Sequence, residues 1–270
     1  MTLHNKNAVI YGAGGSIGGA VSTALAAAGA KVFLTGHRLA SLQKVAEKIK
    51  GFGGQTEIAE VNALDPTAVH DHILSVARTA GSIDLSFNLI NTQDTQDIPL
   101  TEMSLDDFTR PINIAMETHF LTTTAAARLM MKQGSGVILS LTATPGGTAY
   151  PLVGGFGPAC CALEGFSRDL AAELGPYGVR VVNIRSAGSP DSRPFREALA
   201  SGGAEVADFI KKLENDTMLK KLPMMNDIAN VAVFLASDLS GKITGVTIDV
   251  TAGTTNALNY KAERIPFIFK

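Results

Sequence analysis

One short segment near the start of the chain has the residue types and spacing that a phosphate site needs. An apolar run at 6–11 leads directly into a glycine-rich turn, and an alanine-rich stretch follows at 20–28. Glycine permits a tight turn and keeps Cβ atoms away from an approaching anion, while the free N–H groups of a helix's first turn face that anion. A glycine turn can also serve a plain hairpin, but a strand before it and a helix after it favour nucleotide binding. The residues expected to hold the pyrophosphate are Gly12, Gly14, Gly15, Ser16, Ile17 and Gly18.

Strands and helices must alternate to position such a loop, and the rest of the chain shows this alternation. Apolar or β-branched runs predict strands at 8–11, 31–35, 56–61, 85–89, 136–141, 180–184 and 247–250. Helical patterns lie between them at 17–28, 39–49, 66–79, 108–132, 158–174 and 227–237. Crossovers of this length predict a Rossmann-type α/β fold, a doubly wound and mainly parallel sheet of seven strands with helices on both faces.

Two stretches interrupt this alternation. Residues 91–104 are polar and rich in turn-forming residues, and residues 186–221 form a longer, partly helical excursion. Ligands of open α/β sheets lie beyond the carboxyl ends of the strands, so we expect both stretches to wall a substrate pocket. The whole chain, 1–270, is expected to be one dinucleotide-binding domain that the excursion at about 186–221 covers.

Composition argues against several classes of partner. The chain of 270 residues has a formal charge of −2 and no basic stripe, which argues against nucleic acid. Its apolar stretches are too short to span a membrane, and residues 1–7 lack a secretory apolar core. The only cysteines, Cys160 and Cys161, are adjacent, and no metal-ligand spacing is present. We therefore expect a cytoplasmic protein without a metal, a nucleic-acid partner or a membrane anchor.

The chain resembles the short-chain dehydrogenase/reductase family over almost its full length. Residues 11–18 are similar to the family's cofactor loop, with Ser16 where a second glycine is usual. Residues 83–91 are similar to a segment that normally ends in Asn-Asn-Ala-Gly, of which Asn88 is retained. Further similarity to the family's central helix, sixth strand and closing helix and strand lies at 165–174, 178–184, 227–230, 234–237 and 243–245. The resemblance implies the Rossmann-type fold, a nicotinamide cofactor and oxidoreductase activity.

The end of the second predicted strand indicates which nicotinamide cofactor is used. An acidic residue there would bind the ribose hydroxyls of NAD, but Gly36 stands there, followed by His37 and Arg38. A guanidinium pairs well with a phosphate dianion, so we expect NADP in preference to NAD. Arg38 is also consistent with an ordinary exposed arginine of a surface helix. Asp65, before Pro66, is expected to cap a helix, and the remaining cofactor contacts implied by the resemblance are Asn62, Ala63, Asn88 and Gly188.

The catalytic positions implied by the resemblance carry unusual residues. The family uses a tyrosine as proton donor, a lysine one helical turn later, a serine that orients the carbonyl and an asparagine in a proton relay. Aligned on 165–167, Phe156 takes the tyrosine position, Cys160 the lysine position, Ala143 the serine position and Ala115 the asparagine position. Phenylalanine has no proton to give, and a neutral thiol does not supply lysine's fixed charge. The usual proton delivery therefore needs other groups.

Polar residues near these positions are candidate substitutes. Tyr150 could act as the missing acid if its loop folded inward, or could simply pack beside Pro151. Thr142 or Thr144 could orient a carbonyl, although threonine is common at the end of a strand.

Three further candidates have equally plain alternatives. His119, one turn beyond Ala115, is either a catalytic group or a core histidine with its hydrogen bonds satisfied. Cys160, in the first turn of a helix, is expected to have a lowered pKa if it is a nucleophile, or else to be a small buried apolar residue. Arg185 and Ser186 could bind an anionic substrate group or only close a loop.

Two main hypotheses follow. The first is an NADP-dependent oxidoreductase that transfers hydride to an unidentified carbonyl or activated alkene of a small molecule, with altered proton delivery. The second is a catalytically inactive NADP-binding sensor or partner subunit on the same fold, and non-redox chemistry is a third possibility. The resemblance also implies a homodimer or homotetramer, to which the apolar segment 265–269 could contribute a contact.

Overall fold

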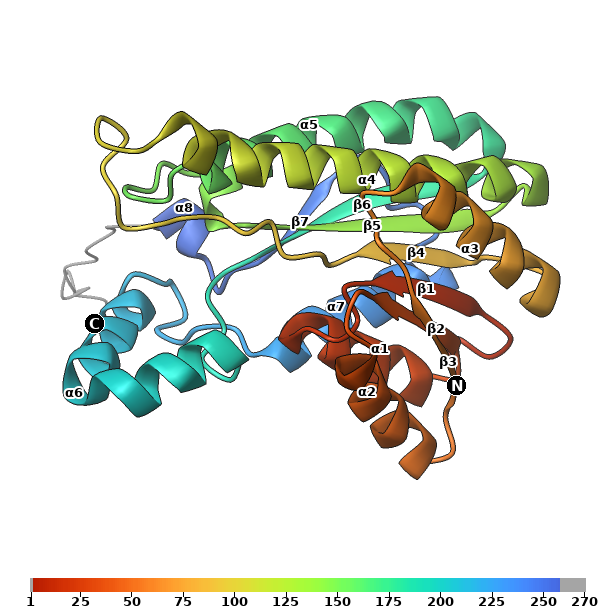
Figure 1. Ribbon diagram of the computed structural model, residues 1–270, viewed down its shortest axis with the longest axis horizontal. Coiled ribbons are helices and arrows are strands. Elements are labelled where there is room, and N and C mark those ends of the chain that lie inside the picture. Colours follow the sequence, from red (N-terminus) through yellow and green to blue (C-terminus); the bar gives the residue numbers. More distant parts are fainter. Residues whose placement is uncertain (1, 258–270) are drawn as a thin grey trace, which may run out of the picture.

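A single parallel sheet organises the computed structural model, which describes residues 2–257. Its seven strands lie in the order β3-β2-β1-β4-β5-β6-β7 (Figure 1). Every neighbouring pair is parallel. The strands are β1 (Asn7–Tyr11), β2 (Lys31–Gly36), β3 (Gln55–Glu60), β4 (Leu85–Asn88), β5 (Gly136–Ala143), β6 (Val179–Ser186) and β7 (Thr247–Val250). The predicted Rossmann-type fold is confirmed; the segment 265–269 lies outside the described residues.

Helices cover both faces of this sheet, as Figure 1 shows. One face carries α1 (Ser16–Ala27), α2 (Leu39–Gly51) and α7 (Met225–Ala236). The other carries α3 (Pro66–Ala80), α4 (Leu105–Gln133) and α5 (Phe156–Leu174). The short elements are α8 (Thr254–Ala257) and the 3-10 turns η1 (Thr144–Gly146), η2 (Gly175–Tyr177) and η3 (Asp238–Ser240).

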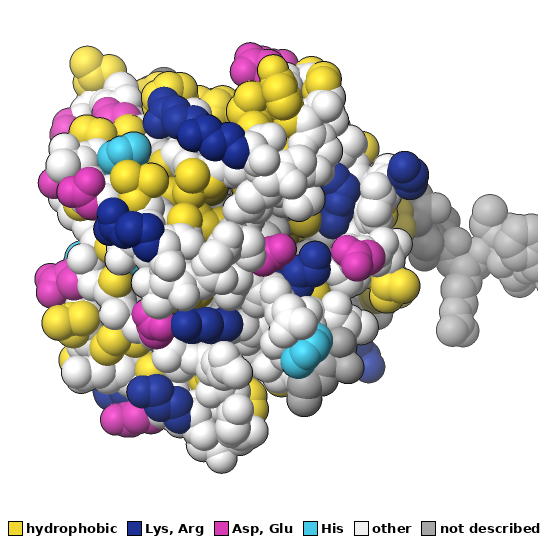
Figure 2. All heavy atoms as spheres, turned by 90° about the vertical axis from the view of Figure 1, so that its right-hand side faces the viewer, with side chains coloured by type: hydrophobic (Ala, Val, Ile, Leu, Met, Phe, Trp, Pro, Cys, Tyr) yellow, Lys and Arg dark blue, Asp and Glu magenta, His cyan; other side chains and the backbone are white. Residues whose placement is uncertain are grey.

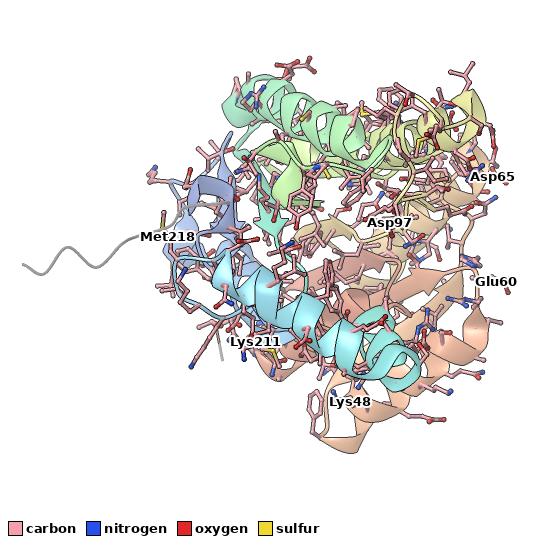
Figure 3. The ribbon with its side chains drawn as sticks, turned by 90° about the vertical axis from the view of Figure 1, so that its left-hand side faces the viewer. Lys48, Glu60, Asp65, Asp97, Lys211 and Met218 are labelled. Carbon is pink, nitrogen blue, oxygen red and sulfur yellow. The ribbon has the colours of Figure 1, made fainter. Side chains whose placement is uncertain are left out.

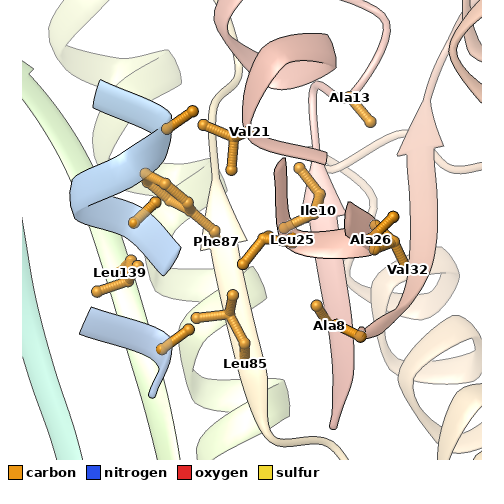
Figure 4. Packing of buried hydrophobic residues seen from close by; sticks show 14 of the residues in the cluster. Ala8, Ile10, Ala13, Val21, Leu25, Ala26, Val32, Leu85, Phe87 and Leu139 are labelled. Carbon is orange, nitrogen blue, oxygen red and sulfur yellow. The ribbon is translucent and has the colours of Figure 1, made fainter. Parts of the chain in front are cut away.

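The central strand β1 is buried on both faces because its side chains alternate between two cores. Ala8 and Ile10 pack with α1, α2 and α7, where Figure 4 shows them beside Leu25. Val9 and Tyr11 belong to the core under α3, α4 and α5. An apolar strand without polar alternation is what a parallel sheet covered on both faces requires.

Local sequence signals account for several element ends. Asp65 caps α3 as expected: its side chain accepts hydrogen bonds from the backbone N–H groups of Thr67 and Ala68, and Pro66 occupies the first turn. The end of α4 is at Gly134, whose φ of 71° suits glycine. Strands β5 and β6 each run two residues beyond the predicted ends, because Ala143 pairs with Ser186 in the ladder.

The long excursion contains α6 (Arg193–Asn215), which is interrupted at Gly203 by a backbone conformation with φ of 55°. Figure 3 views the molecule from the side of α6, which carries Lys211, with Met218 in the segment that follows. On the opposite side, Figure 2 shows basic and acidic side chains interspersed, without a continuous basic stripe on that face. No helix among residues 2–257 is long and apolar enough to cross a membrane.

Candidate active site

A cavity of about 750 Å³ lies at the carboxyl ends of the central strands. The strand order reverses between β1 and β4, and this is where open α/β sheets bind their ligands. We call the part lined by His37, Arg38, Asn62 and Ala63 the outer end. We call the part lined by Asp94, His119, Ala143, Phe156 and Cys160 the inner end. The glycine loop 12–18 lines the cavity between the two ends.

The glycines of this loop serve three different purposes. Gly12 has φ of 74°, and a Cβ on it would collide with the carbonyl of Leu89. A Cβ on Gly18 would collide with the carbonyl of Gly12, so Gly18 lets α1 approach the end of β1. A Cβ on Gly14 would lie 2.7 Å from Cβ of Ser41 in α2. Gly14 therefore allows packing against α2, whereas the sequence suggested that it makes room for a phosphate.

The first turn of α1 provides free N–H groups at the middle of the cavity. Its N-cap, Gly15, offers no side-chain cap, and the first turn contains no acidic residue. Helix N-termini of this kind attract phosphate groups, because the dipole and the unpaired N–H groups act together. The hydroxyl of Ser16 accepts a 3.0 Å hydrogen bond from the backbone N–H of Arg193, which joins this loop to the start of α6.

Basic and amide groups line the outer end, and no carboxylate does. Arg38 forms no ion pair within residues 2–257 and is exposed at the start of α2. The side-chain oxygen of Asn62 accepts a hydrogen bond from the backbone N–H of Leu64 at 3.1 Å, which leaves the amide N–H₂ free to donate. This end therefore suits a ligand that carries negative charge and hydrogen-bond acceptors.

Asn88 acts mainly as a structural group. Its amide donates a 3.2 Å hydrogen bond to the hydroxyl of Thr122 in α4, and its side-chain oxygen accepts one from the backbone N–H of Ile90 at 3.0 Å. These bonds hold the end of β4, which lines the cavity, against α4. Gly188 is not part of the lining; a Cβ there would lie 2.6 Å from the ring of Phe195.

Asp94 is the only carboxylate that lines the cavity within the described chain. The hydroxyl of Thr92 and the amide of Gln96 donate hydrogen bonds to its two oxygens, at 3.1 and 2.6 Å. These two bonds orient the carboxylate within the loop that follows β4. The sequence indicated this loop as a pocket wall but did not single out Asp94, because nothing near it in the sequence marks it.

His119 lies at the inner end with one ring nitrogen unpaired. Its Nδ1 lies 2.9 Å from the carbonyl oxygen of Ala115. Because a carbonyl only accepts, Nδ1 carries the proton and Nε2 presents a lone pair. Nε2 has no hydrogen-bond partner among the described residues, and the side chain is 4% exposed. Burial lowers the pKa of His119 to about 4, so the ring is neutral near pH 7.

Behind the inner end lies a buried polar network. The Nε atom of Arg185 donates to Glu164 at 2.9 Å, and another guanidinium nitrogen donates to Asp249 at 3.0 Å. Thr142 donates its hydroxyl proton to Glu164 at 2.9 Å and accepts from Asn183 at 2.7 Å. Arg185 is thus committed to two carboxylates and is not free to bind an anionic substrate group.

This arrangement of sheet, glycine loop and cavity agrees with the comparison against known families. The family model described as Enoyl-(Acyl carrier protein) reductase matches residues 12–255. The chain belongs to the short-chain dehydrogenase/reductase family.

Individual members of the family are distant relatives. The 3-oxoacyl-(acyl-carrier-protein) reductase of Aquifex aeolicus is 29% identical over 253 residues, which cover 93% of this chain and 98% of that protein. An enoyl-(acyl-carrier-protein) reductase (NADH) of Rhizobium meliloti is 29% identical, covering 93% of this chain and 90% of that protein. An NAD+-bound xylitol dehydrogenase structure has the same fold, with a TM-score of 0.87, 24% identity, and coverage of 94% of this chain and all of that one (100%).

The four positions that the family resemblance aligned with catalytic residues are not all at the cavity. Ala143, Phe156 and Cys160 line its inner end. Ala115 is buried between α4 and α5 against Ala159 and Leu163 and does not line it. Burial raises the pKa of the Cys160 thiol to about 12. A lowered pKa was expected if Cys160 were a nucleophile in a first helical turn, but α5 begins at Phe156 and Cys160 lies one turn further along, so burial of the thiol decides the direction and agrees with the alternative of a small buried residue.

Most of the other candidates for the missing catalytic groups lie away from the cavity or contact other protein groups. Tyr150 does not line the cavity; burial, and then the charge of Asp216, raise the pKa of its phenol. The hydroxyl of Thr144 points to the carbonyl of Ser186 at 3.4 Å. Ser186 does line the cavity. Ser192 and Arg193 at the start of α6 also line the cavity; they belong to the stretch 186–221 that was expected to wall the pocket, although neither residue was singled out.

Proposed function

We propose that this short-chain dehydrogenase/reductase is an NADP-dependent oxidoreductase that transfers hydride between NADP(H) and a small molecule with a carbonyl or activated double bond. The observation that supports this most is the cavity itself. It joins the uncapped first turn of α1 and an exposed Arg38, which has no ion pair within residues 2–257, to an inner end lined by α4, β5 and α5. The cofactor supplies the hydride when bound.

The preference for NADP rests on the outer end. Arg38 and His37 line it without a neighbouring carboxylate, so a 2′-phosphate meets positive charge and no repulsion. The first turn of α1 would bind the pyrophosphate, and the free amide of Asn62 would donate to the adenosine part.

Fluorescence titration with NADPH and NADH tests this proposal. Arg38→Asp should weaken the binding of NADPH by roughly thirtyfold and that of NADH by much less, because a charge-assisted pair with the 2′-phosphate is lost. Lys44→Asp makes the same charge change on the exposed side of α2, outside the cavity, and should leave the ratio of the two affinities unchanged. Equal losses for both cofactors in the Arg38 variant would contradict the role in phosphate binding.

Proton delivery at the inner end differs from that of a tyrosine-dependent enzyme in this proposal. Phe156 and Ala143 have no exchangeable side-chain proton, and the Cys160 thiol is a weak donor. The proton comes from water or from a residue that substitutes for the tyrosine. The same residues favour the second candidate function, a catalytically inactive NADP-binding sensor or partner subunit. Loss of NADPH absorbance with a panel of carbonyl and alkene substrates would exclude that alternative.

We further propose that the whole chain is one domain and that it is a cytoplasmic homodimer or homotetramer. Large apolar side chains exposed on α4, α7 and the segment after it support self-association: Phe120, Phe234 and Leu239. Light scattering coupled to size-exclusion chromatography measures the assembly, and a monomer at micromolar concentration would contradict it.

A further inference from the structure

Two polar groups at the inner end, the buried ring of His119 and the half-buried carboxylate of Asp94, can accept hydrogen bonds from a ligand. The hydroxyl of Thr118 donates its proton to the carbonyl of Ile114 at 2.7 Å, and that of Thr142 donates to Glu164. The groups that can still accept are the carboxylate of Asp94, each of whose oxygens accepts one hydrogen bond and has a further lone pair, and Nε2 of His119, which has no partner among the described residues. The amides of Asn91 and Gln93 lie at the exposed rim of the cavity. Such a site complements a ligand that donates hydrogen bonds or carries positive charge.

The charged residues around the cavity also favour a cationic ligand at the inner end. The arginines of the cavity, Arg38 and Arg193, lie at the outer end and beside the glycine loop, and no lysine or arginine lines the inner end. Reduction of a neutral ketone forms an alkoxide, which needs a proton or a nearby cation. Beside Asp94, with Phe156 and Ala143 as neighbours, a developing negative charge would be repelled rather than stabilised.

We propose that the inner end binds cationic carbon–nitrogen double bonds, so that the substrates of this chain are iminium ions rather than neutral carbonyl compounds. This rests on the proposed function, because a reduced nicotinamide cofactor is the hydride source. The iminium carbon accepts the hydride and a C–H bond forms as the C=N π bond breaks. The π electron pair stays on nitrogen as the lone pair of a neutral amine, and the oxidised cofactor is the other product. The hydride-transfer step uses no proton, so it needs no acid at the position of Phe156.

Binding to the cofactor-free protein tests the charge preference without any turnover. The probes are N-methyl dihydroisoquinolinium, which has no N–H proton to lose and is cationic near pH 7, and α-tetralone, a neutral ketone with the same bicyclic ring size. Isothermal calorimetry should show the iminium ion binding at least about tenfold more tightly than the ketone. Equal affinities would overturn the proposal.

Asp94→Asn should weaken binding of the iminium ion by about fivefold to tenfold, the effect of losing one partly screened charge. It should leave binding of the ketone unchanged. The matched control is Asp97→Asn, in the same loop and labelled in Figure 3, because Asp97 does not line the cavity. Its positive φ of 65° is also tolerated by asparagine. If both variants behaved alike, the effect would be one of overall charge and the proposal would fail.

The pH dependence of NADPH oxidation provides the second readout. Hydride transfer to the iminium ion takes up no proton in the site, and the amine product is protonated afterwards by the solvent, whereas reduction of a ketone needs a proton at the forming alkoxide. The titratable groups lining the cavity are Tyr11, His37, Arg38, Asp94, His119, Cys160 and Arg193. None has to give up a proton, so the iminium rate should be flat from about pH 7 to about pH 9.

The outcomes separate this proposal from the proposed function. Binding of NADPH with reduction of ketones only would overturn the iminium proposal and leave the oxidoreductase standing. Failure to bind NADPH would overturn the oxidoreductase, while calorimetry would still measure the preference for a cation. Reduction of the iminium ion that is lost in Asp94→Asn and retained in Asp97→Asn would support both.

Discussion

The two ends of the cavity are built in different ways. The glycine loop joins β1 to α1, and the outer end comes from the residues that follow β2 and β3; together they present backbone N–H groups and positive charge. The inner end combines the loop after β4 with side chains of α4, β5 and α5, and its free groups are acceptors. The outer end thus suits a polyanion, whereas the inner end suits a donor or a cation. A single cavity can thus favour an anionic ligand at one end and a cationic ligand at the other.

The largest expected effect removes the backbone geometry of the glycine loop. Gly12→Val places a branched side chain at φ of 74° and against the carbonyl of Leu89. We expect a loss of about 3 kcal/mol in the free energy of unfolding and loss of NADPH binding. Urea denaturation and fluorescence titration measure the two.

The control for this change is Gly53→Val. Gly53 has a similar φ of 81°, but a Cβ there meets nothing within 4 Å. This variant should lose only the conformational part, about 1–2 kcal/mol, and should keep its cofactor affinity. Equal losses in both variants would show that close approach to Leu89 is unimportant.

Low pH should decrease the free energy of unfolding through the buried ring of His119. Its pKa is about 4 in the folded chain, against about 6.5 when unfolded, because burial disfavours the charged ring. Above pH 6.5 the ring is neutral in both the folded and the unfolded chain, so the stability that depends on its neutral form is fully present. As the pH falls from about 6.5 to about 4, the unfolded chain binds the proton first and stability falls, by about 3 kcal/mol for this residue.

Urea denaturation at several pH values measures this fall. His72, whose pKa burial also lowers to about 4, contributes to it in the same pH range. His119→Asn should therefore remove about half of the pH-dependent loss, whereas His70→Asn, on the exposed side of α3, should remove none. An unchanged pH dependence in the His119 variant would contradict a buried, neutral ring.

The smallest effect concerns the contact between the glycine loop and α6. Ser16→Ala removes the acceptor for the backbone N–H of Arg193 and should lower the free energy of unfolding, measured by urea denaturation, by about 1 kcal/mol. Ser41→Ala is the control, since Ser41 also lines the cavity but makes no side-chain hydrogen bond to the described residues. A larger effect at Ser41 would place the important contact in α2 instead.

Most of the fold could be predicted from the sequence, because strands and helices of this sheet follow local patterns. The apolar run of β1, the cap at Asp65 and the glycine turn each involve neighbouring residues. Short 3-10 turns such as Gly175–Tyr177 were not predicted, since three residues leave no periodic pattern. The commitment of Arg185 to Glu164 and Asp249 was also missed, because its partners lie 21 and 64 residues away.

The sequence by itself therefore determined the order of the elements, the glycine loop and the positive charge at Arg38, because each depends on contacts within a few residues. Only the tertiary structure decided that Asp94 and His119 meet at one cavity and that Ser16 contacts Arg193 across 177 residues. It also decided the protonation states of two groups at the inner end, the Cys160 thiol and the His119 ring. Desolvation depends on which side chains surround a group, and burial raises the pKa of Cys160 and lowers that of His119. Those surroundings come from several elements that meet only in the folded chain.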